Sequence, residues 1–363
     1  LRADDEIYRV LNAQSSQVTL KRLDLAFQAF FRRVKSGGEP GFPRFTSFER
    51  FSGWGYKNHG DGFRLTPGDG NQHGKLRLSG IGSIRVRGRA RTYGEVKTCE
   101  IQHKHGSWYA SLTIECERKR TSGTKAMGFD WGVTTFATIA REDGEFEDGE
   151  FAEIGNPRFF KRHEASVTRA SRYLDECTVK DSIGRPTNGK DPKRIEAKRA
   201  FGRAKAREAN ARKDFLHRTS TKIIAENALI ATETLQIKSM TGSASGRVDR
   251  AGKNVAQKAG LNREILATAP AAFLSMLKYK ADEAGAFSIE TPTKTLKPSQ
   301  RCSNCGLLPK VKKALSERQH LCECGCVLTR DQNAARNNLR WALNYFGREP
   351  ARNAIHRRQP WVA

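Results

Sequence analysis

The sequence contains no apolar run of about 18 residues, the length that a helix needs to cross a bilayer. Acidic residues are few relative to basic ones, because 39 Asp and Glu stand against 65 Lys and Arg. The first residues are polar and acidic, and they lack the basic and then apolar order of a secretory signal. These absences argue against a membrane-spanning or secreted protein. The chain also lacks an initiator Met, which favours a start within a longer protein.

The basic surplus amounts to a formal net charge of +26 over 363 residues. A surplus of this size predicts a polyanionic partner, usually nucleic acid. The alternative is a basic protein whose Lys and Arg side chains form only a solvated surface. Between Pro157 and Lys222 the sequence has 19 Lys and Arg but eight Asp and Glu, so this segment is the densest basic region. The length allows two or three domains.

Five of the eight cysteines lie within residues 302–326, in the order Cys302-x-x-Cys305 and then Cys322-x-Cys324-x-Cys326. Two close thiolate pairs on short turns predict a tetrahedral zinc site, and four thiolates leave no open position, so this zinc would be structural. Glycine follows both Cys305 and Cys324, which favours Cys302, Cys305, Cys322 and Cys324 as ligands. Cys326 is an alternative to Cys322. The other cysteines are expected to be ordinary thiols: Cys99, Cys116 and Cys177.

Three acidic residues each stand at the end of a buried segment: Asp130 in GFDWGVTTFAT, Glu233 in ALIATE and Asp331 in TRDQNAARN. A carboxylate at such a place is costly unless it is paired. If the three converge, they provide the hard oxygen ligands that Mg²⁺ prefers, and a two-Mg²⁺ site can hydrolyse phosphodiesters. The alternative is that each acid only ends a strand or caps a helix. The order strand-Asp, strand-Glu, helix-Asp is that of RNase H-type nucleases and favours catalysis.

Hydrophobic periodicity divides the chain into helical and β-rich parts. Four aromatic residues near the basic strands either stack on nucleic-acid bases or fill a core: Trp54, Tyr56, Phe63 and Tyr93. The predicted helices cover residues 1–36, 157–226 with a break at 181–191, 262–284 with Asn262 as the cap, and a segment from Asp331. The predicted strands lie within 46–117, 126–140, 228–233 and 286–290, and 243–261 is expected to be a mobile loop.

These motifs resemble the TnpB proteins of bacterial insertion sequences, which are relatives of the type V CRISPR nucleases. The resemblance runs from about residue 10 to residue 340. The segments that carry it are GFDWGVTTFAT, ALIATETLQIKSM, KYKADEAGAF and CSNCGLLPKVKKALSERQHLCECGCVLTRDQNAARNNL. Two features differ from the family: the second cysteine pair is C-x-C where many members have C-x-x-C, and many members have more sequence before the first helix.

The resemblance implies a multidomain α/β and α+β protein with an RNase H-like RuvC nuclease domain and a zinc-ribbon insertion. The implied domains are a helical recognition-lobe segment that is incomplete at its N-terminus (1–40), a wedge-type β-barrel (41–125), the RuvC domain with its basic helical insertion at 157–226 (126–296), a zinc-ribbon module that binds target nucleic acid (297–328), the last RuvC helix (329–346) and a basic tail (347–363).

The resemblance also implies an RNA-guided DNA endonuclease of a transposable element. Asp130, Glu233 and Asp331 would be the catalytic ligands of Mg²⁺, and Arg330 and Asn333 would either orient the scissile phosphate or cap a helix. The implied partners are a guide RNA from the transposon end and double-stranded DNA with a short adjacent motif, without a membrane or a required protein partner. The implied location is the nucleoid region of a bacterial or archaeal cytoplasm. The alternatives are an RNA-guided repressor that binds without cutting, a transposase or its accessory protein, and a junction resolvase.

Overall fold

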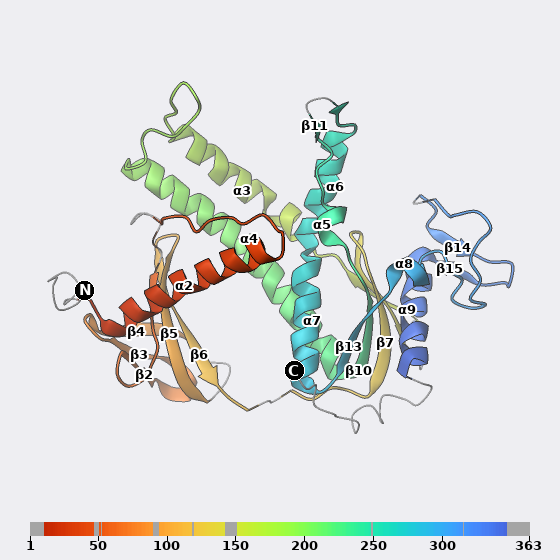
Figure 1. The fold of residues 1–363 in the computed structure, drawn as a ribbon, viewed down its shortest axis with the longest axis horizontal. Coiled ribbons are helices and arrows are strands. Elements are labelled where there is room, and N and C mark those ends of the chain that lie inside the picture. Colours follow the sequence, from red (N-terminus) through yellow and green to blue (C-terminus); the bar gives the residue numbers. More distant parts are fainter. Residues whose placement is uncertain are drawn as a thin grey trace. The chain divides into compact units, whose positions relative to one another are not determined.

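The computed structural model describes residues 11–46, 51, 53–89, 94–117, 120–141, 151–247, 250–314 and 316–346. The chain forms two compact units (Figure 1). Unit 1 comprises residues 1–117 with 198–200, and unit 2 comprises residues 118–197 and 201–363. The start of the first predicted helix, Tyr93 and the basic tail lie outside the described residues. No helix in the described ranges combines the length and apolar character of a bilayer span.

The first described helix of unit 1 is α2 (Ala13–Lys35), which Asn12 caps by accepting hydrogen bonds from the backbone N–H groups of Gln14 and Ser15. Six strands follow in two antiparallel sheets, of order β1-β5-β6 and β2-β3-β4. These strands and one short 3₁₀ helix are β1 (Gly53–Tyr56), β2 (Phe63–Pro67), η2 (Asp69–Asn71), β3 (Gln72–Leu78), β4 (Gly82–Arg89), β5 (Glu95–Lys104) and β6 (Ser107–Glu115).

The two sheets of unit 1 share one core, which includes Tyr56, Phe63, Leu76 and Ile101. Tyr56 and Phe63 are therefore core residues and cannot stack on bases, whereas Trp54 is half-buried. The strands predicted for this region are present, and within the described residues they pair into two three-stranded sheets. No ladder in the described part of unit 1 joins the two sheets.

Unit 2 is organised around a five-stranded sheet of order β13-β10-β7-β8-β9. Strands β7, β8 and β9 are antiparallel neighbours, whereas β10 runs parallel to β7 and β13 runs parallel to β10. The interior strand β10 is mostly apolar and buried along almost its whole length, as a strand covered on both faces must be. The strands are β7 (Lys125–Trp131), β8 (Thr135–Arg141), β9 (Phe151–Gly155), β10 (Asn227–Glu233) and β13 (Phe287–Thr291).

The remaining elements of unit 2 cover or extend this sheet. The helices are α3 (Phe159–Glu176), α4 (Pro192–Glu226, apart from residues 198–200), α5 (Ile237–Met240), α6 (Val255–Thr268), α7 (Pro270–Ala284), α8 (Thr293–Leu296) and α9 (Arg330–Phe346). Two short hairpins join β11 (Gly246–Arg247) to β12 (Arg250–Ala251) and β14 (Gln319–Leu321) to β15 (Val327–Thr329).

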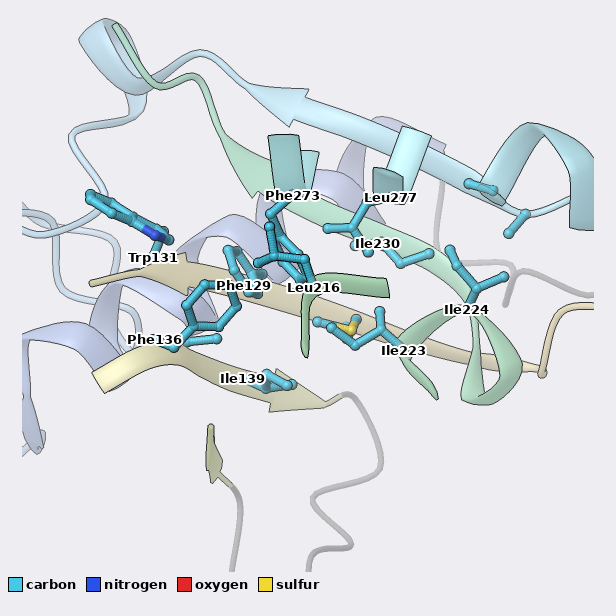
Figure 2. Close-up of a cluster of buried hydrophobic side chains, with 14 of the residues drawn as sticks. Phe129, Trp131, Phe136, Ile139, Leu216, Ile223, Ile224, Ile230, Phe273 and Leu277 are labelled. Atoms are coloured by element: carbon cyan, nitrogen blue, oxygen red, sulfur yellow. The ribbon is translucent and has the colours of Figure 1, made fainter. Parts of the chain in front are cut away.

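One face of the sheet packs against α4, α6 and α7, and Figure 2 shows this core. The ring of Phe273 from α7 lies 5.7 Å from that of Phe129 in β7 and 4.9 Å from that of Phe136 in β8. A fully buried lysine, Lys280, joins α7 to α4 by donating from Nζ to the carbonyl of His217 and to two hydroxyls, those of Ser220 and Thr221.

The other face of the sheet packs against α9, which lies across from α7 in Figure 1. The helix approaches so closely that a Cβ atom on Gly128 of β7 would lie 2.0 Å from the carbonyl oxygen of Ala335. Glycine at position 128 is therefore required by contact with the helix. The side chains of Ala335, Leu339 and Ala342 fill the remaining space against the sheet.

The helix predicted for residues 262–284 is two helices, and Asn262 caps neither of them. Pro270 cannot continue the preceding helix, and Ala269 takes a left-handed conformation with φ 50° that separates α6 from α7. Asn262 lies inside α6, where its Nδ2 donates to the carbonyl of Thr241 at 2.9 Å. The segment predicted as a loop up to residue 261 is thus helical from Val255.

Candidate functional site

Asp130 and Glu233 stand at the same edge of the unit 2 sheet. Phe129 in β7 pairs in parallel register with Thr232 in β10, so the next residue of each strand brings the two acids side by side. Neighbours in register on parallel strands point to the same face. That face is the one covered by α9, because Gly128, two residues before Asp130, contacts that helix. Both acidic side chains are half-buried, so solvent still reaches them.

Asp331 reaches this edge from the first turn of α9 and is also half-buried. A reciprocal pair caps the helix: Gln332 Oε1 accepts from the backbone N–H of Thr329 at 3.0 Å, and Thr329 Oγ1 accepts from that of Gln332 at 3.2 Å. The packing of α9 against β7 carries Asp331 toward Asp130. The three acids that the sequence singles out therefore converge on one end of the sheet.

The three carboxylates act on each other electrostatically. Burial, followed by repulsion from Glu233 and Asp331, holds the pKa of Asp130 well above its usual range, and nearby Arg330 partly offsets this rise. Burial, with repulsion from Asp331, raises the pKa of Glu233 to about 7. A site in which clustered carboxylates hold protons near neutral pH has a negative field that favours a cation.

The three acids do not form one tight ligand group. Within the described ranges, the groups of three or more ligating side chains whose ligand atoms all lie within 4.8 Å of one another are composed of cysteine and histidine. At least one pair of the three carboxylates therefore lies farther apart than that distance, although the acids are close enough to shift one another's pKa.

The cysteine module, residues 302–329, brings four thiols together. Cys302 Sγ lies 3.7 Å from Cys324 Sγ, and Cys305 Sγ lies 3.6 Å from Cys322 Sγ. A tetrahedron with metal–sulfur bonds of about 2.3 Å has sulfur–sulfur edges of about 3.8 Å. The four sulfurs, all within 4.8 Å of one another, therefore have nearly the spacing that zinc requires.

Glycines form the turns of both cysteine pairs. Gly306 and Gly325 have φ values of 78° and 84°, and their N–H groups donate to the carbonyls of Cys302 and Cys322 respectively. The repeated turn is the geometric basis for pairing Cys322 with Cys324. A hydrogen bond from the backbone N–H of Cys326 lowers the pKa of Cys324 to about 6, which favours the thiolate form that binds metal.

Cys326, the alternative ligand, lies in a second group with Cys302 and His320. The sequence motif did not point to His320, which is 2% exposed and whose Nδ1 lies 3.0 Å from the ammonium of Lys313. His320 stands two residues before Cys322, a spacing that is not a recognised ligand motif. Only the folded hairpin of β14 and β15 shows that His320 lies near Cys302 and Cys326. A lysine ammonium can only donate, so this contact places the imidazole proton on Nε2.

Arg330 and Asn333 have structural contacts, and neither is the helix cap. Asn333 is completely buried, which keeps it away from any phosphate. Its Nδ2 donates to the carbonyls of Pro298 and Arg301, and its Oδ1 accepts from the N–H of Ser303 at 2.8 Å. Arg330 donates to the carbonyl of Ala314 at 2.9 Å. These contacts fasten the cysteine module to the helix that bears Asp331.

Asn338, also on α9, is a further residue that the motif analysis missed. It is completely buried and contacts the ends of two strands of the sheet. An asparagine in the interior of a helix is an unfavourable choice without a hydrogen-bonding role. The pair Asn337-Asn338 was the available signal, but the sequence does not say which strands such residues contact.

Two family models match the chain. One, described as "Probable transposase" and named OrfB_IS605, matches residues 100–244. The other, described as "Cas12f1-like, TNB domain", matches residues 271–338 and so includes the cysteine module up to the middle of α9. Together they cover Glu233, Asp331 and Asp130 as well as the cysteines.

Two curated relatives are 30% identical to the chain. An Escherichia coli (strain K12) protein named "Putative RNA-guided DNA endonuclease InsQ" aligns over 332 residues, which cover 90% of this chain and 74% of the relative. A Streptomyces pristinaespiralis protein named "Putative RNA-guided DNA endonuclease" aligns over 237 residues, 64% of this chain and 50% of the relative. The chain therefore spans half the length of the second relative.

A solved structure shares the fold. It is titled "Cryo-EM structure of the Cas12f1-sgRNA-target DNA complex", and it superposes with a TM-score of 0.54 at 13% sequence identity. The superposition covers 90% of this chain and 71% of that chain. At this identity the likeness establishes a common mixed α/β fold.

Proposed function

The chain belongs to the TnpB family of insertion-sequence proteins, and from that premise we propose that it is an RNA-guided DNA endonuclease. The observation that carries the proposal is the convergence of Asp130, Glu233 and Asp331 on one edge of the unit 2 sheet, where they raise one another's pKa values. The names of the two relatives are the basis for proposing DNA as the substrate and RNA as the guide. The acid cluster is the basis for proposing metal-dependent hydrolysis of the phosphodiester.

We assign unit 2 to the RNase H-like RuvC fold on the basis of its sheet. Three antiparallel strands, β7 to β9, are followed by the parallel strands β10 and β13, with acids at the ends of β7 and β10 and on α9. The domain boundaries expected from the sequence remain part of this proposal. Residues 297–328 would be the module that contacts target nucleic acid, and the strands of unit 1 would form the wedge region.

The donor set fits Mg²⁺, because carboxylate oxygens are the ligands that this hard cation prefers. Asp130, Glu233 and Asp331 would hold it, and their half-buried positions leave a side open to a DNA strand. Bound there, Mg²⁺ would supply Lewis-acid stabilisation of the phosphate and a water of lowered pKa. The elevated pKa of Glu233 means that this carboxyl group must lose a proton before it can bind the cation, so cleavage is expected to weaken below neutral pH.

The thiols fit zinc, because their spacing matches a sulfur tetrahedron. We propose Cys302, Cys305, Cys322 and Cys324 as the ligands of a structural zinc. Its role would be to fold the cysteine module, which Asn333 then attaches to α9 beside the acid cluster.

The basic segment between Pro157 and Lys222 would contact the guide RNA and the RNA–DNA duplex. Most Lys and Arg side chains of α3 and of the first half of α4 are exposed and could contact phosphates. Neutralisation of phosphates releases counterions, so guided binding should weaken steeply as salt rises. Sequence would be read by pairing with the guide, while the protein recognises duplex shape and a short DNA motif.

Replacement of Asp130 with Ala tests the proposed function. With guide RNA and a matching DNA target in Mg²⁺, we expect the cleavage rate to fall by about a thousandfold or more, because a metal ligand in the reacting centre is lost. Binding of the guided complex to DNA should stay within about twofold of wild type, since the phosphate contacts are retained. Cleavage by D130A at the wild-type rate would refute the site, and efficient cutting by RNA-free protein would refute RNA guidance.

A further inference from the structure

Among the hydrogen bonds found in the described chain, those of the Asn338 side chain on α9 reach β7, which carries Asp130, and β13, which is paired with the strand that carries Glu233. Asn338 lies seven residues and so about two turns after Asp331, on the same face of the helix. It is 0% exposed, so neither solvent nor substrate can be its partner. Its hydrogen bonds are therefore entirely with the sheet.

The first of these bonds reaches β7. Asn338 Nδ2 donates to the carbonyl oxygen of Phe129 at 3.0 Å. That carbonyl lies in the same rigid peptide plane as the backbone nitrogen of Asp130. A bond that fixes the carbonyl therefore fixes the direction in which the chain enters Asp130.

The second bond reaches β13. Asn338 Oδ1 accepts from Thr291 Oγ1 at 2.8 Å, and Thr291 is paired in register with Glu233. The carbonyl of Thr291 in turn accepts from the backbone N–H of Thr234 at 3.3 Å and from the Thr234 hydroxyl at 2.9 Å. Thr234, the residue after Glu233, is thus bonded to Thr291, which also donates to Asn338.

We propose that Asn338 is a positioning residue that sets the spacing of the acid cluster for divalent-cation binding. This inference rests on the proposed function of that cluster. Asp130 and Glu233 lie side by side at one end of the sheet and Asp331 reaches that end from α9, so these like-charged groups need a surrounding structure that fixes their positions. Asn338 links the ends of β7 and β13 to α9, the helix that carries Asp331. Its Nδ2 donates to β7 and its Oδ1 accepts from β13, so one short side chain makes both bonds.

Four variants test this role. Asn338→Leu removes both bonds at nearly constant volume, and Thr291→Val removes only the hydroxyl of the second bond. Thr291→Ser retains that hydroxyl and is the conservative rescue. Asn227→Leu is the matched control, because Asn227 is also a buried asparagine that donates to a backbone carbonyl, but at the opposite end of β10 from Glu233.

Two readouts are measured for each variant: the Mg²⁺ concentration that gives half-maximal guided cleavage, and the rise in Tm that Mg²⁺ alone produces in nucleic-acid-free protein. Loss of a residue that orients metal ligands typically weakens metal affinity by tenfold or more. We expect N338L to raise the half-maximal Mg²⁺ concentration by about tenfold and to reduce the Mg²⁺-induced rise in Tm. T291V should move both readouts in the same direction by a smaller factor, while T291S and N227L retain the wild-type Mg²⁺ requirement.

The inference is overturned if N338L and T291V lose stability as N227L does but keep the wild-type Mg²⁺ requirement and the wild-type metal-induced shift. If N338L does not fold, the comparison of T291V with T291S decides. Failure of the proposed function looks different: wild-type protein loaded with guide would cut no DNA, and the Mg²⁺-induced Tm shifts of the variants would still decide the role of Asn338.

Discussion

The cysteine module and the acid cluster are both suited to metal, but they are built in opposite ways. The four thiols belong to residues 302–324, and two glycine turns bring their sulfurs within 4.8 Å of one another. The acids come from residues 130, 233 and 331, and a five-stranded sheet with a packed helix brings them to one edge. A local site and an assembled site thus lie next to each other in one unit.

The difference in construction corresponds to a difference in chemistry. Four thiolates around one ion would leave no position for a substrate, so a zinc ion held there would be structural rather than catalytic. The acids are half-buried and raise one another's pKa, so solvent still reaches a group of carboxylates whose negative field favours a cation. The contacts of Asn333 and Asn338 join the two sites through α9, so the stability of one supports the geometry of the other.

The largest effect is expected from breaking the local site. Cys324→Ser removes one of four zinc ligands, and structural zinc contributes binding free energy of about 10 kcal/mol in small domains. We expect loss of bound zinc and rapid hydrogen exchange in β14 and β15, with the β7–β10 ladder still protected. Zinc content and hydrogen exchange measure the two results. Full zinc occupancy in C324S would contradict the ligand set.

A smaller effect, of opposite sign, is expected from the assembled site. The pKa of Glu233 is raised from 4.5 to about 7, and each unit corresponds to about 1.4 kcal/mol. The folded state therefore binds this proton more tightly than the unfolded state, and metal-free stability falls as pH rises from about 4.5 to 7. We expect Glu233→Gln to stabilise metal-free protein at pH 8 by roughly 2 kcal/mol, measured by urea unfolding.

The matched control for that variant is Glu290→Gln, which replaces an exposed carboxylate on the neighbouring strand β13. This control should change the free energy of unfolding at pH 8 by less than about 0.5 kcal/mol, as surface substitutions usually do. If E233Q destabilises the metal-free protein at pH 8, the carboxylate has a favourable partner and the repulsion inferred for the cluster is wrong.

Binding of Mg²⁺ to the acid cluster is expected to depend on pH. A proton on Glu233 or Asp130 competes with the cation, and both pKa values are raised. The rise in Tm caused by Mg²⁺ should therefore be at least about twofold larger at pH 8 than at pH 5.5. Thermal unfolding with and without Mg²⁺ at both pH values measures it. An equal rise at the two pH values would show that Mg²⁺ binds elsewhere.

The smallest effect is expected at Cys326. Its sulfur lies with Cys302 and His320 rather than in the group of four, so Cys326→Ser should keep one zinc per chain and nearly wild-type stability. Zinc content and urea unfolding of C326S beside C324S give the contrast. If Cys326→Ser loses zinc while Cys322→Ser keeps it, Cys326 is the ligand in place of Cys322.

The sequence was sufficient wherever a short pattern determines local structure. The Cys-Gly turns, the apolar strand ending at Glu233 and the strands around Asp130 were all predictable from residue type and spacing. The break between α6 and α7 was also readable in principle, because Pro270 forbids an uninterrupted helix. The error there came from giving the apolar periodicity more weight than the proline.

The remainder depended on contacts between segments that are far apart in the chain. The aromatic residues Tyr56 and Phe63 became core residues because two sheets face each other around them. The pairing of the described strands of unit 1 into two sheets depended on the same contacts, since strand pairing is set by tertiary packing. Arg330 and Asn333 became attachment points only because the cysteine module folds back onto α9.

The sequence alone determined the chemistry available to this protein: clustered thiols for a soft metal, three separated carboxylates and a large basic surplus. These are properties of residue type, and folding does not change them. Only the tertiary structure decided how these groups are placed: the sulfurs lie 3.7 Å apart in Cys302 and Cys324 and 3.6 Å apart in Cys305 and Cys322, and the three acids meet at one end of the sheet. The physical reason is that like charges do not assemble by themselves, so a sheet, a helix and a buried asparagine must hold them in place.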